Sequence, residues 1–186
     1  MSKPARGGKP WPARGGKPWD LKLQTFRPVL PIATYEVSLS GRLVSSVEVK
    51  ATGDVLHEIF AYKPHHLASG FPDIIQNVVL VEGSWGTAGS VVFGSYTLDG
   101  RKQVIKSIID AVDSSKKSIT YKLIEGDLLQ LYRTVSITIR VDTHDGNNSV
   151  TWIMDYVKQS PNVPDPNSLM DMFYTLTKGI DSHHAN

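Results

Sequence analysis

The stretch VEGSWGTAGSVV, residues 81–92, lies between two apolar runs and is the starting point for predicting the fold. One run precedes it at Ile74–Glu82, and the other begins inside it and covers Ser90–Leu98. Its glycines recur at every third position, and glycine accepts a positive φ more readily than any other residue. We therefore expect two strands joined by a tight turn. A nucleotide-binding loop is not expected, because that motif needs Gly-Lys-Ser/Thr opening a helix, whereas a strand follows here.

The same pattern of apolar runs separated by turn residues continues on the C-terminal side of this turn. Apolar and polar residues alternate, and the runs are separated by turn signals such as Asp99-Gly100 and Asp145-Gly146. Further strands are therefore expected at Val104–Val112, Ser118–Ile124, Tyr132–Val141 and Ser149–Val157. Successive strands with connections this short predict an antiparallel meander.

Upstream of the turn, the chain predicts one more strand and two short helices. Between Val37 and Val49 the apolar residues fall mostly at odd positions, which is the period of a strand. Gly53-Asp54 then opens a helical stretch in which Asp54 is the expected N-cap. A second short helix is expected at Pro64–Gly70, packed against the first.

The C-terminal part of the chain changes to helical periodicity. Apolar residues recur at helical spacing from Leu169 to Ile180, and Asn167 or Ser168 is the expected cap. This order of elements predicts an α+β domain in which a curved antiparallel sheet buries the apolar face of one long helix. Because such a sheet need not close completely around the helix, the architecture leaves room for an internal hydrophobic cavity.

The first 33 residues differ in composition from the rest. The eight residues PARGGKPW occur twice in succession, at 4–11 and 12–19, with no apolar period. We expect a disordered basic leader over 1–33 and a folded domain over 34–186. The leader holds a net charge of +6, which leaves −4 on the domain and makes nucleic acid an unlikely partner for it. A leader that binds single-stranded RNA through its Arg-Gly-Gly pairs is a weaker alternative.

Composition excludes several classes of protein. Hydrophobic residues make up 40% of the 186, enough for a real core. The absence of cysteine removes disulfides, zinc–thiolate sites and thiol catalysis. No run approaches the roughly 18 consecutive apolar residues of a membrane helix, so membrane insertion is not expected. No Gly-x-Ser-x-Gly elbow is present, so a serine hydrolase has little support.

Four segments resemble one protein family. They read KPHHLASGFPDIIQNV (63–78), VEGSWGTAGSVV (81–92), YKLIEGDLLQLY (121–132) and VTWIMDYVK (150–158). On these segments the chain is identified as a member of the major latex protein branch of the Bet v 1-like, pathogenesis-related class 10 proteins, in the START-like helix-grip superfamily. The resemblance implies a seven-stranded antiparallel sheet around the C-terminal helix, with two short helices and a cavity for apolar or amphipathic plant metabolites. It does not decide between a carrier and an enzyme.

Residues that face inward in such a fold line the cavity, whereas in most other proteins they form a plain core. The lining expected on the resemblance is Tyr96, Tyr121, Leu123, Ile137, Trp152, Met154, Leu169, Met172, Phe173 and Leu176. Tyr96 and Tyr121 would offer hydroxyl groups in an apolar space, and Trp152 a face for stacking. No catalytic residue is fixed by the sequence. The weak candidates for moving a proton are His65, His66 and Tyr121, with the histidines better explained as a solvent-facing or capping pair.

The leading hypothesis is a cytoplasmic plant protein that binds a hydrophobic terpenoid, alkaloid, phenolic or sterol-like molecule, as a carrier or in defence. The alternative is a cofactor-free enzyme of specialised metabolism, a cyclase, isomerase or lyase that folds a reactive intermediate in the cavity. Neither hypothesis requires a metal or an organic cofactor. The expected partner is a small hydrophobic metabolite, and the expected state is a monomer or a weak dimer.

Overall fold

A computed structural model describes residues 37–184 of the chain. Seven antiparallel strands form one sheet in the order β1-β7-β6-β5-β4-β3-β2. The strands are β1 (Ser40–Val49), β2 (Ile75–Glu82), β3 (Val91–Leu98), β4 (Arg101–Asp113), β5 (Ser118–Gly126), β6 (Tyr132–His144) and β7 (Asn147–Lys158). The helices are α1 (Gly53–Ala61), α2 (His66–Gly70) and α3 (Asn167–His184), with one 3₁₀ turn, η1 (Asp127–Gln130). The predicted α+β, helix-grip fold class is confirmed.

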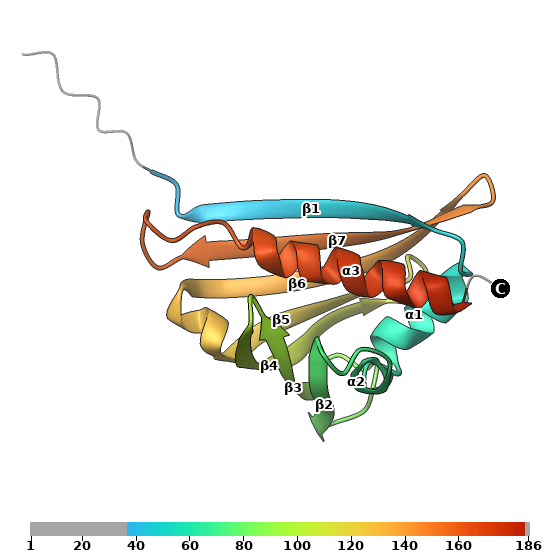
Figure 1. Cartoon of the computed structure of the whole chain (residues 1–186), viewed down its shortest axis with the longest axis horizontal. Helices are drawn as coiled ribbons and strands as arrows, with labels where there is room; N and C mark the ends of the chain where they lie inside the picture. The colour runs from blue at the N-terminus through green and yellow to red at the C-terminus, as the bar shows by residue number, and fades with distance from the viewer. Residues whose placement is uncertain (1–36, 185–186) are drawn as a thin grey trace, which may run out of the picture. The chain divides into compact units, whose positions relative to one another are not determined.

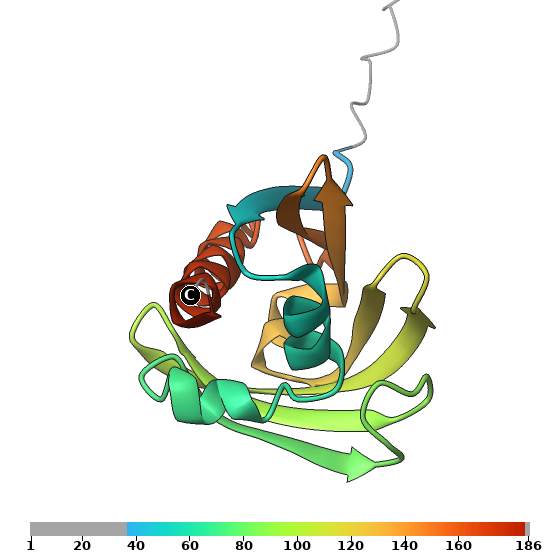
Figure 2. The same ribbon diagram turned by 90° about the vertical axis from the view of Figure 1, so that its right-hand side faces the viewer.

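The sheet curves, and the long helix α3 lies along its open side. In Figure 1, α3 runs in front of β6 and β7, and in Figure 2 it fills the space between β1 and the β3–β4 hairpin. The short helices α1 and α2 lie at the end of the sheet where α3 finishes. The sheet, α3 and these two helices therefore surround a common interior.

Alternation along the strands decides which side chains face that interior. In β6 and β7, apolar residues at every second position are buried, and their neighbours are partly or fully exposed except Thr151, which is also buried. The pairing of Ile137 with Met154 and of Ile139 with Trp152 places their side chains on one face. Because a one-residue slip would turn all of them to solvent, the buried pattern fixes the register of this pair.

Turn chemistry fits the predicted hairpins. Asp99 and Gly100 both take a positive φ between β3 and β4, and Asp145 and Gly146 do so between β6 and β7. Asp and Gly tolerate this conformation, and two such residues in succession suit the twist of a two-residue hairpin. The Asp-Gly pairs therefore mark these turns correctly.

Several element boundaries differ from the sequence-based expectation. Thr52, not Asp54, stands at the N-cap of α1, and Asp54 lies in the first turn, where its carboxylate pairs with Lys117 at 2.6 Å. Strand β4 begins at Arg101, before the expected start at Val104. Its first residues, Arg101, Lys102 and Gln103, pair with β3 but are polar, so the apolar pattern could not indicate them. The turn η1 was not expected. The predicted leader, residues 1–33, lies outside the described residues.

Two polar contacts hold α3 against the sheet. The buried carboxylate of Asp181 accepts hydrogen bonds from the backbone amides of Lys50 and Ala51, at 2.7 and 2.9 Å. One turn before Asp181 on α3, Oγ1 of Thr177 accepts a hydrogen bond of 2.9 Å from the indole Nε1 of Trp152 on β7. Since both partners on α3 are buried, these bonds fix the position of the helix along its axis as well as its distance from the sheet.

Candidate functional site

An internal cavity of about 160 Å³ lies between α3 and the inner face of the sheet. Every strand but β1 contributes to its wall, and α1 and α2 contribute to one end. The apolar part of the wall is Phe60, Pro64, Leu67, Ile75, Val78, Val92, Ile105, Ile137, Ile139, Trp152, Leu169, Met172, Phe173 and Leu176. A cavity of about 150 Å³ lined in this way stays dry and accepts a ligand such as benzene. The cavity is therefore suited to a small apolar molecule.

Eight of the ten residues expected to line the cavity do so. Leu123 and Met154 are buried but are not among the residues that form the wall. Both have the inward parity that the strand pattern predicts, and both are packed in the continuous core around the cavity. Alternation along a strand identifies which residues face the interior. It does not identify which of them line a cavity and which pack against other side chains.

The two lining tyrosines have their hydroxyl groups engaged by the protein. Tyr121 donates to the carbonyl oxygen of Phe60 at 2.9 Å, and Tyr96 donates to Oε1 of Gln103 at 2.9 Å. Burial raises the pKa of both phenols above their ordinary value, with the charge of Asp127 adding to the effect at Tyr96. Each tyrosine therefore stays neutral and offers a ligand only the lone pairs of its oxygen.

The indole of Trp152 is less free than the sequence suggests. One face stacks on Phe173, with ring centroids 4.2 Å apart and planes inclined by 9°. Phe60 meets the same indole edge-on at 5.1 Å. These contacts give Trp152 a fixed orientation, so its exposed atoms form a rigid part of the wall.

The histidine pair lies outside the cavity. Pro64 and Leu67 line it on either side of the pair, but neither His65 nor His66 does. His65 stacks on Trp85 at 5.2 Å, and its Nδ1 is buried with no hydrogen-bond partner in the described part of the chain. His66 instead lines an outer groove with His183 and His184. Neither imidazole is placed to exchange a proton with a molecule in the cavity.

The glycine turn between β2 and β3 is confirmed as a backbone requirement. Gly83, Gly86 and Gly89 all have positive φ, at 87°, 69° and 89°. Gly86 additionally lies against the ring of Tyr62 at the end of α1, where a Cβ would overlap the ring. The turn is thereby held next to α1 and α2, which close one end of the cavity.

Lys106 of β4 turns away from the cavity, unlike its neighbours Ile105 and Ser107. Its Nζ pairs with Glu125 at 3.0 Å. Among residues 37–184, no cluster of histidine and carboxylate side chains could hold a metal ion. In the same span, no helix is long and apolar enough to cross a membrane.

Several wall residues were missed by sequence reasoning. Ser107 is buried on the inner face of β4, and Asn77 and Ser95 join the wall from β2 and β3. Phe60 and Leu67 enter it from the short helices. The parity of Ser107 relative to Ile105 could have indicated its place, whereas the contribution of α1 and α2 depends on tertiary packing.

A second hollow, an open groove of about 630 Å³, lies at the other end of α3. It is lined by the β3–β4 hairpin, η1, the loop before α3 and the first residues of α3. Leu169 belongs to the walls of both the groove and the cavity. The two hollows are therefore neighbours, and the wall of the cavity is the more apolar of the two.

Comparison with known proteins identifies the family to which this fold belongs. The model of the pathogenesis-related protein Bet v 1 family matches residues 38–186, which is more than three quarters of the chain. The chain belongs to the Bet v 1 family. Within that family its relatives are major latex-like proteins, as the four sequence segments indicated.

The similarity to individual Bet v 1 family members is substantial. MLP-like proteins 28 and 34 of Arabidopsis thaliana are each 42% identical, over 78% and 80% of this chain. The matched region spans only 44% and 48% of the length of these two relatives. The crystal structure of major latex-like protein 151 from Panax ginseng has a TM-score of 0.78 at 38% identity, covering 80% of this chain and 100% of that one.

Proposed function

We propose that this chain binds one small hydrophobic or amphipathic plant metabolite in its internal cavity and carries it in unchanged form. The observation that carries the proposal is the cavity of about 160 Å³ with a wall built almost wholly from aliphatic and aromatic side chains. Transfer of an apolar ligand from water into such a space is favourable by about 25 cal/mol per Å² of buried surface, before the costs of association.

The size of the cavity narrows the ligand class. Sites for drug-sized ligands measure about 300–1,000 Å³, so a space of about 160 Å³ suits one ring or two fused rings. Small terpenoids and simple phenolics fit this description best. A larger alkaloid or a sterol-like ligand requires Met172, Phe173 or Leu67 to move.

The enzymatic alternative is less well supported. Among residues 37–184, no carboxylate or imidazole belongs to the cavity wall. Two tyrosines do belong to it, and burial raises the pKa of both. A cyclase, isomerase or lyase would need a group that gives or takes a proton near neutral pH. We therefore rank the carrier above the enzyme.

The proposed carrier function includes expectations about domain limits, oligomeric state and location. Residues 34–186 would form the ligand-binding domain and residues 1–33 an appended leader. We expect a monomer or weak dimer that acts in the cytoplasm. The absence of cysteine is compatible with that reducing compartment. A role in plant defence would follow from the identity of the ligand.

The proposal is tested by incubating the full-length protein with a panel of plant metabolites, including unstable terpenoid and alkaloid intermediates. Native mass spectrometry then identifies bound and released species. One unchanged ligand per chain supports the carrier. A product that forms in excess over protein, faster than in buffer alone, would overturn it in favour of the enzyme.

A further inference from the structure

The β3–β4 hairpin connects the interior of the molecule with its surface through one row of side chains. Residues at every second position on both strands face α3, and antiparallel register pairs them across the ladder. From the interior outward the pairs are Val92–Ser107, Gly94–Ile105, Tyr96–Gln103 and Leu98–Arg101. The row thus changes from apolar, through hydrogen-bonding groups, to a cation.

This row passes from the cavity into the open groove. Ser107, Ile105 and Tyr96 line the cavity, whereas Gln103 and Arg101 line the groove. The hydrogen bond of 2.9 Å from the Tyr96 hydroxyl to Gln103 Oε1 lies where the two hollows adjoin. Leu169 borders both hollows and lies at the same boundary.

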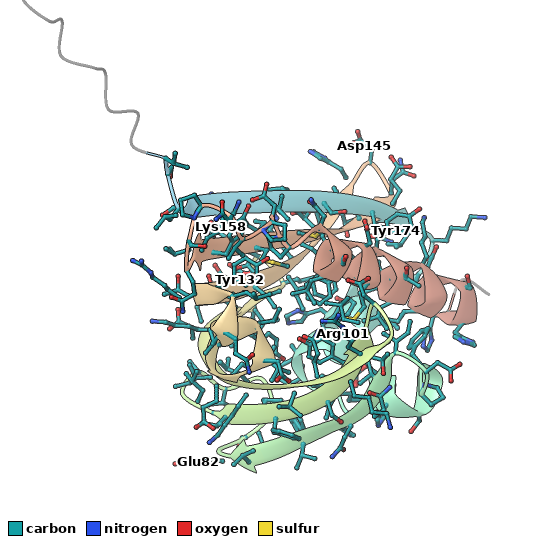
Figure 3. All side chains as sticks on the ribbon, turned by 60° about the vertical axis from the view of Figure 1, so that its left-hand side comes forward. Glu82, Arg101, Tyr132, Asp145, Lys158 and Tyr174 are labelled. Carbon is teal, nitrogen blue, oxygen red and sulfur yellow. The ribbon has the colours of Figure 1, made fainter. Side chains whose placement is uncertain are left out.

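Two cations, Arg101 and Lys102, line the groove, and Arg101 is the one that belongs to this row. Figure 3 shows it on the side of the hairpin that faces α3. Within residues 37–184 its guanidinium makes no ion pair and no side-chain hydrogen bond. Lys102, the next residue, pairs with Thr97 and so has the opposite parity on the strand.

The carboxylates of the groove are mostly committed to the protein. Asp127 accepts a hydrogen bond from the backbone amide of Val104 at 2.7 Å. Asp165 is paired with Lys158 at 2.7 Å and accepts a hydrogen bond from Tyr156 at 2.6 Å. The charge of Asp165 is thus balanced by Lys158, and the charges of Asp127 and of Asp99 at the tip of the hairpin remain beside Arg101 and Lys102 on the groove wall.

We propose that the ligand is an apolar acid, with its body in the cavity and its anionic head group on Arg101 in the groove. This inference rests on the proposed function and adds the chemistry of one end of the ligand. The planar guanidinium presents two parallel N–H donors, which match the two oxygens of a carboxylate. The hydrogen-bonded Tyr96–Gln103 pair lies between the two binding points.

Three ligands that share a naphthyl ring separate the head group from the body. Naphthaleneacetic acid, naphthaleneethanol and naphthaleneethylamine are titrated calorimetrically into full-length protein and into Arg101→Gln. The matched control is Arg133→Gln, an exposed arginine on β6 that lines neither hollow and gives the same change in net charge. Thermal melts verify that all variants fold.

The expected order of affinity is acid, then alcohol, then amine. An exposed charge-assisted contact gives the acid an advantage of about three- to tenfold over the alcohol, which shrinks as salt is added. Arg101→Gln removes this advantage and leaves the affinity for the alcohol unchanged, whereas Arg133→Gln changes neither.

Two failures are distinguishable. If the alcohol binds but the acid has no advantage, or if the amine binds most tightly, the anionic head group is refuted and the cavity proposal stands. Equal loss of the acid's advantage in Arg133→Gln refutes the role of Arg101 in the same way. If none of the three ligands binds, the proposed function fails as well.

Discussion

The indole of Trp152 both stacks on Phe173 and donates a hydrogen bond to Thr177, one turn further along α3. The ring centroids are 4.2 Å apart, and the distance from Nε1 to Oγ1 is 2.9 Å. One side chain of β7 thus meets two successive turns of the helix that covers the sheet. Because Trp152 and Phe173 also line the cavity, the contact that fixes α3 also fixes the shape of the site.

Replacing Thr177 by Val tests the hydrogen-bonding half of this contact. Valine has nearly the same shape but leaves the buried indole N–H without an acceptor. A buried donor that loses its partner costs about 1–3 kcal/mol. We expect Thr177→Val to lower the free energy of unfolding by that amount in urea titrations.

Thr175 supplies the matched control on the same helix. Its hydroxyl donates to the carbonyl oxygen of Asp171, four residues back, as that of Thr177 does to Phe173, but Thr175 is exposed. Thr175→Val should change the free energy of unfolding by less than about 0.5 kcal/mol. Equal losses in the two variants would contradict the role assigned to the indole.

Gly86 and Gly89 provide a second matched pair. Both take a positive φ, so an alanine at either position should cost about 1–2 kcal/mol in backbone strain. A Cβ at Gly86 also overlaps the ring of Tyr62, whereas a Cβ at Gly89 meets nothing within 4 Å. Overlap adds about 1–3 kcal/mol, so Gly86→Ala should be the less stable variant by chemical denaturation. Equal stabilities would show that the turn does not rest on α1.

Acid should weaken the packing of the glycine turn on α2. Burial lowers the pKa of His65 below its ordinary value of 6.5, and the neighbouring His66 and Lys63 lower it further. The unfolded chain therefore binds a proton more readily than the folded one, and stability is lost as the pH falls below 6.5. We expect the melting temperature to fall between pH 7.5 and 5.5, a window of about one unit on either side of that value.

Phenylalanine at position 65 isolates this contribution, since it keeps a ring against Trp85 but cannot be protonated. The fall in melting temperature should be smaller in His65→Phe than in the wild type. Part of the fall should remain, because burial and the charge of Lys117 also lower the pKa of His57. The exposed His144→Gln at the end of β6 serves as control. A pH profile for His65→Phe identical to that of the wild type would refute the assignment.

The fold was predictable from the sequence because its signals are local. Asp-Gly pairs mark two hairpins, glycine spacing marks a third turn, and strand alternation identifies which residues are buried. Strand ends were less predictable, since the polar pair Arg101-Lys102 extends β4 without any apolar period. The short turn η1 leaves no periodic signal at all.

The site was predictable only in part, because a cavity is a property of three-dimensional packing. Parity placed Trp152 and Ile137 in the wall, but it could not separate them from Met154, which is packed in the core. Nor could parity show that the Tyr121 hydroxyl donates a hydrogen bond to the carbonyl oxygen of Phe60, 61 positions away in the sequence. The stack of His65 on Trp85 also depends on how α2 meets the glycine turn.

The central claim, that the cavity holds the ligand, is tested most directly by filling it. Ser107→Leu places a branched apolar side chain into the cavity, and Ser136→Leu makes the same change on the opposite face of the sheet. We would measure the calorimetric affinity of naphthaleneethanol for both variants, after verifying their folding by thermal melts. We predict one ligand per wild-type chain, an affinity at least about tenfold weaker in Ser107→Leu, which corresponds to about 1.4 kcal/mol, and no change in Ser136→Leu. Undiminished binding to Ser107→Leu would contradict the account.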